Sequence, residues 1–187
     1  MTQNSAQPEQ FTGLILLTGI DAPGIASFLF ETLAPFAVHV IDIEQVVISN
    51  RLILTVLIGA NPAHQSAIEE DLATCATTLD VDIATLFGKT ELATMPQDLV
   101  HLIISAPKLH PRDLALTTQL ITNAGANIQS FSRTSDNPVS IKMTVSGASV
   151  KEIESAITSL VFDNETTISV SVRYIYGLCK TTGATRC

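Results

Sequence analysis

"LILLTGIDAPG", from Leu14 to Gly24, returns 88 positions further along the chain as "LIISAPKLHPR", from Leu102 to Arg112. In both copies a run of apolar residues leads into a turn that contains proline. A second pair of segments aligns at the same offset, because "AVHVIDIEQ" from Ala37 lies over "GANIQSFSR" from Gly125. The two copies agree better in the placement of apolar and turn-forming residues than in residue identity. The sequence therefore predicts two copies of one domain.

The repeat sets the expected domain boundaries. We expect the first domain over residues 12–88 and the second over residues 97–176, with "GKTELATMPQ" (88–97) as the linker. Residues 1–11 and 177–187 are expected to be flexible tails. The chain has 187 residues, of which 46% are apolar. This length and this composition suffice for two small domains with hydrophobic cores.

Each copy predicts the element order strand, helix, strand, strand, helix, strand. The expected strands of the first copy cover about 13–19, 38–48, 52–58 and 81–87, with a hairpin turn at "SNR" (49–51). Asn61 and Pro62 open its second helix. Helical spacing predicts buried faces made of Ile25, Phe28, Leu29, Leu33 and Phe36, and of Ile68, Leu72, Cys75, Ala76 and Leu79.

The second copy repeats this order, with its hairpin turn at "TSDNP" (134–138). Its buried helix faces are predicted to be Thr117, Leu120, Ile121 and Ala124, then Val150, Ile153, Ile157, Leu160 and Val161. Six elements in this order predict an α+β fold: two tandem ferredoxin-like βαββαβ domains. In each, a four-stranded antiparallel sheet carries both helices on one face.

The strands of the first copy raise a question about the opposite face of its sheet. Leu14–Leu17 and Leu52–Ile58 are almost entirely apolar at odd and even positions, and Asp42 and Glu44 are the obvious polar breaks. A strand that is apolar on both sides is normally covered on both sides. We therefore expect another layer there, from the sister copy or from a second chain, and a homodimer. The alternative is that the large apolar residues lie only at strand ends.

Composition limits the partners. Lysine and arginine number 10 against 18 acidic residues, a net charge of −8, and no basic cluster occurs. Nucleic acid and anionic membrane both need such clusters, so neither is expected as a partner. The first ten residues contain no lysine or arginine, and no apolar run reaches membrane-spanning length. We therefore expect a cytoplasmic protein.

No cofactor or metal is expected. The three cysteines have no C-x-x-C spacing, which argues against a zinc site or a disulfide framework. Cys75 falls on a predicted buried helix face, whereas Cys179 and Cys187 lie in the polar tail. The histidines lack metal-ligand spacing, and His39 and His101 are expected to be structural residues at strand starts.

The turn "DAPG" from Asp21 to Gly24 has two interpretations. As a simple turn, Asp21 caps the following helix, Pro23 suits its first turn and Gly24 adopts an unusual backbone conformation. As a binding site, free N–H groups at the helix start attract a carboxylate, while Asp21 pairs with an ammonium group. Together these groups would suit an α-amino acid.

"LLTGIDAPGIASFLFETLAPFAVHVIDIEQVVI" and the later "NAGANI" (123–128) resemble the ACT domain, a small amino-acid-sensing module of metabolic enzymes. The tandem pair resembles more specifically the N-terminal regulatory region of bacterial phosphoserine phosphatases. The resemblance covers about residues 12–175. It implies that serine or a related amino acid binds between ACT domains, at the loop formed by Gly19, Ile20, Asp21, Ala22, Pro23 and Gly24.

The second copy departs from this pattern, because Leu109 and Arg112 stand where the first copy has Asp21 and Gly24. An equivalent second site is therefore in doubt. We expect no catalytic residues, since no D-x-D-x-T motif of the related phosphatases occurs. The chain is expected to be a non-catalytic regulatory module, either a truncated form of a longer enzyme or a stand-alone chain. The alternative is a purely structural oligomerisation module without a ligand.

Overall fold

The computed structural model describes residues 9–91, 99–158 and 167–169. The chain divides into two units, Met1–Ala93 and Thr94–Cys187, each with its own contacts. The expectations for Leu160, Val161, Cys179, Cys187 and the 177–187 tail lie outside the described residues.

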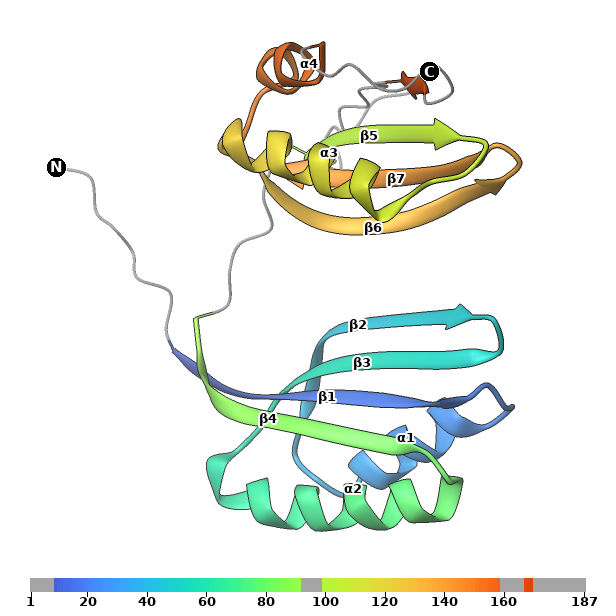
Figure 1. Ribbon diagram of the computed structural model, residues 1–187. Coiled ribbons are helices and arrows are strands. Elements are labelled where there is room, and N and C mark those ends of the chain that lie inside the picture. The colour runs from blue at the N-terminus through green and yellow to red at the C-terminus, as the bar shows by residue number, and fades with distance from the viewer. Residues whose placement is uncertain (1–8, 92–98, 159–166, 170–187) are drawn as a thin grey trace, which may run out of the picture. The chain divides into compact units, whose positions relative to one another are not determined.

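The first unit contains one four-stranded antiparallel sheet in the order β2-β3-β1-β4, with two helices (Figure 1). Its elements are β1 (Gln10–Ile20), α1 (Ile25–Leu33), β2 (His39–Ile48), β3 (Arg51–Gly59), the short 3-10 helix η1 (Pro62–His64), α2 (Gln65–Leu79) and β4 (Asp82–Thr90). Two strands run further than the sequence suggested. Gln10 and Phe11 belong to β1 rather than to a tail, and residues 88–90 belong to β4 rather than to a linker.

The second unit repeats this topology, with strand order β6-β7-β5-β8. Its elements are β5 (Leu99–Ala106), α3 (Pro111–Asn123), β6 (Asn127–Asp136), β7 (Val139–Ser146), α4 (Val150–Thr158) and β8 (Thr167–Ser169). The predicted α+β class, with two tandem ferredoxin-like domains, is confirmed.

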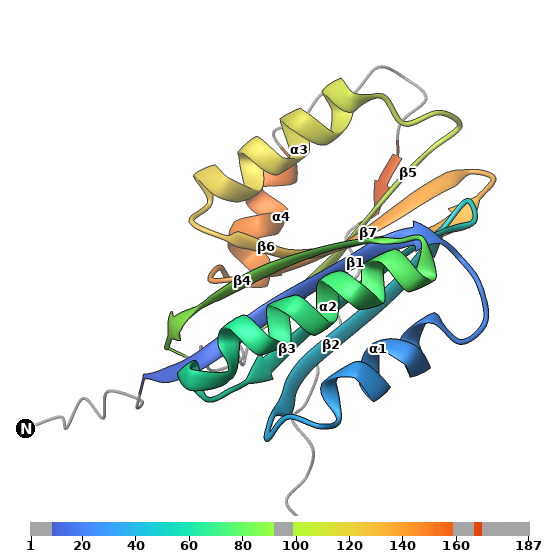
Figure 2. The ribbon, with the colours of Figure 1, turned by 90° about the horizontal axis from the view of Figure 1, so that it is seen from below.

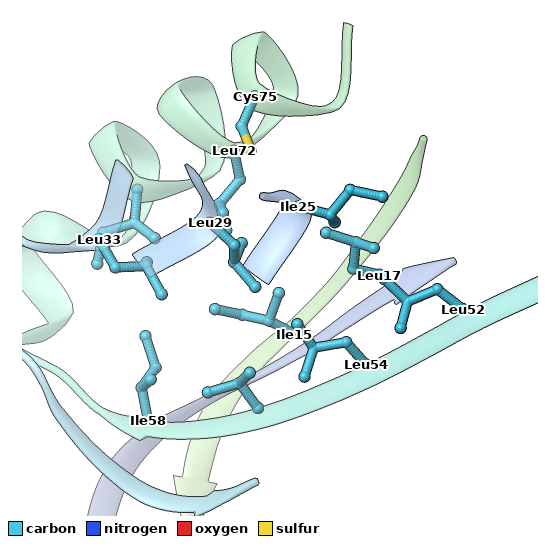
Figure 3. Packing of buried hydrophobic residues seen from close by; sticks show 12 residues of the cluster. Ile15, Leu17, Ile25, Leu29, Leu33, Leu52, Leu54, Ile58, Leu72 and Cys75 are labelled. Atoms are coloured by element: carbon cyan, nitrogen blue, oxygen red, sulfur yellow. The ribbon is translucent and has the colours of Figure 1, made fainter. Parts of the chain in front are cut away.

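The hydrophobic core of the first unit lies between its sheet and its helices. Figure 2 shows α1 and α2 on the same side of the sheet, and Figure 3 shows side chains of helices and strands meeting there. The fully or nearly buried members are Ile15, Leu17, Ile25, Leu29, Leu33, Leu52, Leu54, Val56, Ile58, Ile68, Leu72 and Cys75. Phe28, Phe36 and Leu79 pack against this cluster while partly exposed.

The second core has the same plan. Ile121 of α3 and Ile153 and Ile157 of α4 pack on alternate residues of β5 and β7, such as Leu102 and Met143. Thr117 is also buried, whereas Leu120, Ala124 and Val150 are only partly so. Both helices therefore cover one face of the sheet.

The other face of the first sheet is open and apolar. Leu14 and Leu16 each expose 38% of their surface, although they lie in the middle of β1, and Leu86 on β4 exposes 71%. The proposal that large apolar residues lie only at strand ends is therefore wrong. Every residue of the edge strand β2 except Ile41 is also exposed.

The corresponding face of the second sheet carries polar side chains around Ile103. His101 Nδ1 lies 3.1 Å from Thr144 Oγ1, and the hydroxyl groups of Ser105 and Ser140 lie 2.8 Å apart. Lys142 lies between these two pairs along β7. The two repeats thus share a topology but differ in the chemistry of their open faces.

Candidate functional site

The loop between β1 and α1 contains all six residues predicted to bind a ligand. Gly19 and Ile20 end β1, and the segment from Asp21 to Gly24 leads into α1. Asp21 to Gly24 are exposed, and Ile20 retains 60% of its accessible surface. The six residues therefore form one continuous segment that a ligand can reach.

The start of α1 has no side-chain cap. Gly24 is its N-cap residue, with a φ of 93° in the left-handed region, and its carbonyl accepts the Phe28 N–H at 2.9 Å. The expectation that Asp21 caps this helix is wrong, because no side chain bonds to the first turn. The open N–H groups of a helix start are able to bind an anion.

Asp21 is held through its backbone rather than its side chain. Its N–H donates to the carbonyl of Asn50, in the β2–β3 hairpin turn, at 3.1 Å. Within the described part of the chain, no hydrogen bond or ion pair involves its carboxylate. This carboxylate is therefore free to pair with a cationic group of a ligand.

Gly19 serves a packing role at the end of β1. A β-carbon at this position would lie 2.6 Å from Cγ1 of Val81, much closer than a carbon–carbon contact permits. Glycine thus lets the turn between α2 and β4 approach the end of β1.

A surface hollow of about 430 Å³ lies where the turn between α2 and β4 approaches the end of β1. Its lining residues are Thr18, Gly19 and Ile20 of β1, Arg51 of β3, and Ala76, Thr77, Asp80, Val81 and Asp82 around the end of α2. Asp21 to Gly24 do not line it. The hollow and the predicted loop therefore share only Gly19 and Ile20.

Sequence reasoning missed three charged residues of this hollow: Arg51, Asp80 and Asp82. All three are exposed and lie far from the loop along the chain. Strand register brings Arg51 and Asp82 near the end of β1, because Arg51 pairs with Ile20 and Asp82 pairs with Thr18. The "SNR" turn was the available signal, since a tight hairpin places its last residue beside the end of the central strand.

The second unit has no equivalent loop. Leu109 packs against the core, and Arg112 is an exposed residue in the first turn of α3. A carboxylate of this helix already lies at its start, because the His110 N–H donates to Asp113 Oδ2 at 3.0 Å. The glycine N-cap and the unpaired aspartate of the start of α1 are therefore both absent from the described start of α3.

The remaining candidates are structural. His39 begins β2 and hydrogen-bonds to Gln10 with 3.0 Å between their Nε2 atoms, whereas His101 lies inside β5 and contacts Thr144, so both histidines have hydrogen-bond partners. Cys75 is a core residue, and burial raises the pKa of its thiol, against a smaller opposing effect of a hydrogen bond with Thr32. Across residues 9–91, 99–158 and 167–169, no cluster of three potential metal ligands occurs.

No helix in the described part of the chain is long and apolar enough to cross a membrane.

The family model of the ACT domain matches residues 12–85, which are β1 to β4 of the first unit without their outermost residues. The first unit therefore matches the ACT domain family over most of its length, and the second unit repeats its topology.

Two bacterial relatives extend the match across both units. The chain is 28% identical over 169 residues to phosphoserine phosphatase SerB2 of Mycobacterium tuberculosis, covering 87% of this chain and 41% of that protein. It is 30% identical over 155 residues to a phosphoserine phosphatase of Streptomyces coelicolor, covering 79% and 37%. The chain thus spans about two fifths of the length of these relatives.

Solved structures share the tandem fold. A protein described as a glycine cleavage system transcriptional repressor superposes with a TM-score of 0.69 at 16% identity, covering 88% of this chain and 98% of that one. A protein from Galdieria sulphuraria gives a TM-score of 0.68 at 14% identity, covering 89% and 99%. At these identities the similarity establishes the fold alone.

Proposed function

We propose that this chain is a regulatory module that binds a small amino acid, serine or a close relative, and works as a homodimer without catalysis of its own. The effector site is the loop from Gly19 to Gly24. The proposed role corresponds to that of a regulatory region of a phosphoserine phosphatase in L-serine biosynthesis. A cytoplasmic location remains a prediction from the sequence.

The observation that carries this proposal is the free carboxylate of Asp21 beside the uncapped start of α1. The ammonium group of an amino acid would pair with the Asp21 carboxylate. Its carboxylate would accept hydrogen bonds from the free N–H groups at the start of α1. So small a ligand makes few contacts, and we expect a binding free energy of about −4 to −8 kcal/mol, which is millimolar to micromolar affinity. Such affinities suit a sensor of a metabolite that is abundant in the cell.

The homodimer is supported by the open apolar face around Leu14, Leu16 and Leu86. Contiguous exposed apolar residues commonly mark an interaction surface. The exposed edge strand β2 also leaves backbone groups for pairing with another strand. These same surfaces favour the second candidate function, a purely structural oligomerisation module that binds no ligand.

The test is thermal unfolding of the full chain with and without millimolar L-serine, with D-serine as the control. A ligand that binds only the folded state raises the midpoint. We expect L-serine to raise it more than D-serine does, and we expect Asp21→Ala to abolish this difference.

Asp71→Ala, which removes an exposed carboxylate on α2, is the matched control and should retain the response. If neither serine nor any other common amino acid stabilises the protein, the structural module is the better description.

A further inference from the structure

Residues of opposite charge line the hollow at the end of β1 and, in the part of the chain that is described, form no ion pair with one another. The lining residues include one basic residue, Arg51, and two acidic residues, Asp80 and Asp82. Among the residues that the structure describes, no ion pair or hydrogen bond engages any of these three side chains. One basic and two acidic residues therefore line a hollow of about 430 Å³, and their side chains remain available to a ligand.

The sheet sets the separation of these charges. Arg51 on β3 pairs with Ile20, and Asp82 on β4 pairs with Thr18, so that β1 runs between them. Two strand spacings place the backbones of β3 and β4 roughly 10 Å apart. Arg51 and Asp82 therefore lie on opposite sides of the end of β1, and a ligand that contacts both reaches across this end of the strand.

The end of α2 favours a cationic group at this place. Asp80 is the C-cap residue, in the left-handed conformation, and the last turn of the helix contains no basic residue. The C-terminal end of a helix carries partial negative charge, and carboxylates there are unfavourable unless a cation accompanies them. A bound ammonium group would offset the unfavourable interaction between the carboxylates and the negative end of the helix.

We infer that this hollow is a second binding site of the first unit, for a small zwitterion with a carboxylate and an ammonium group. Arg51 binds the carboxylate, because its planar fork matches two carboxylate oxygens. Asp80 and Asp82 bind the ammonium group. The site goes beyond the proposed function, because its charged residues lie outside the loop from Gly19 to Gly24, although Gly19 and Ile20 belong to both.

The test is a titration of the isotope-labelled full chain followed by two-dimensional ¹⁵N NMR, with glycine as the smallest amino-acid zwitterion. Acetate and methylammonium supply its two charged halves separately. We expect glycine to cause saturable shifts of the amides of Arg51 and of residues 76–82. Acetate and methylammonium should each need at least tenfold higher concentrations.

Arg51→Gln and the double variant Asp80→Asn/Asp82→Asn should each remove the saturable shifts. Arg51→Lys should weaken binding without abolishing it, because it keeps the charge and loses the fork. Arg133→Gln is the matched control, since this arginine already pairs with Asp136 at 2.9 Å in the second unit. It should leave the titration unchanged.

The two proposed sites fail separately. Glycine shifts that persist in Arg51→Gln, or an absence of saturable shifts at residues 76–82, would overturn the hollow as a site and leave the loop untouched. Conversely, Asp21→Ala should leave the hollow titration unchanged. A titration abolished by Asp21→Ala would show a single site at the loop.

Discussion

At the scale of single residues, Gly24 decides how the chain enters α1. Its φ of 93° is a conformation that side chains with a β-carbon rarely adopt. A β-carbon at this position would nevertheless meet nothing within 4 Å. The requirement for glycine is therefore conformational rather than steric crowding.

We predict that Gly24→Ala lowers the free energy of unfolding by about 1–2 kcal/mol, the cost of the left-handed conformation for alanine. Gly24→Asn should cost less, because asparagine tolerates this region better. Urea denaturation measures both. Gly88→Ala is the matched control, since a β-carbon there also meets open space but its φ is not positive. Equal losses in Gly24→Ala and Gly88→Ala would contradict the conformational explanation.

At the scale of elements, the start of α4 shows how a local sequence pattern stabilises a helix. The backbone N–H and the hydroxyl group of Ser149 both donate to Glu152 Oε2 at 2.7 Å. These hydrogen bonds hold the pKa of the exposed Glu152 carboxyl below its usual 4.5. The pair is a capping box, in which side chains satisfy the first N–H groups of the helix.

This lowered pKa predicts a pH dependence of stability. A carboxyl group with a lower pKa in the folded state stabilises it at pH values above 4.5, and this contribution disappears as pH falls through the folded-state pKa. We expect Glu152→Gln to be less stable than wild type at pH 7, with the difference shrinking below pH 4.5. Urea denaturation across this range measures it.

Ser149→Ala, which removes one of the two donors to the Glu152 carboxylate, should reduce the same pH dependence. A gap between wild type and Glu152→Gln that stays constant down to pH 3 would argue against the carboxylate as the source.

At the scale of the whole molecule, the two units repeat one topology with different open faces. Strand periodicity places apolar side chains such as Leu14 and Leu86 on the open face of the first sheet. The second sheet presents hydroxyl groups and Lys142 in the corresponding place. We therefore expect the first unit, rather than the second, to make the contact between chains.

We predict that Leu86→Glu weakens the homodimer at least tenfold, because it places a charge in an apolar contact. The side chain is 71% exposed in the chain, so folding should be little affected. Analytical ultracentrifugation measures association, and Ile103→Glu on the second sheet is the control. Unchanged association in Leu86→Glu would exclude this face, and a monomeric wild type would refute the homodimer itself.

The sequence by itself determined the element order, the tandem repeat, most core positions and the apolar open face. These features are periodic, so neighbouring residues report them: a period of 3.6 marks a helix face and a period of 2 a strand face. The tertiary structure decided that Asp21 leaves α1 uncapped and that Arg51 and Asp82 flank the end of β1. Both depend on strand register and backbone direction, through which residues distant in sequence meet.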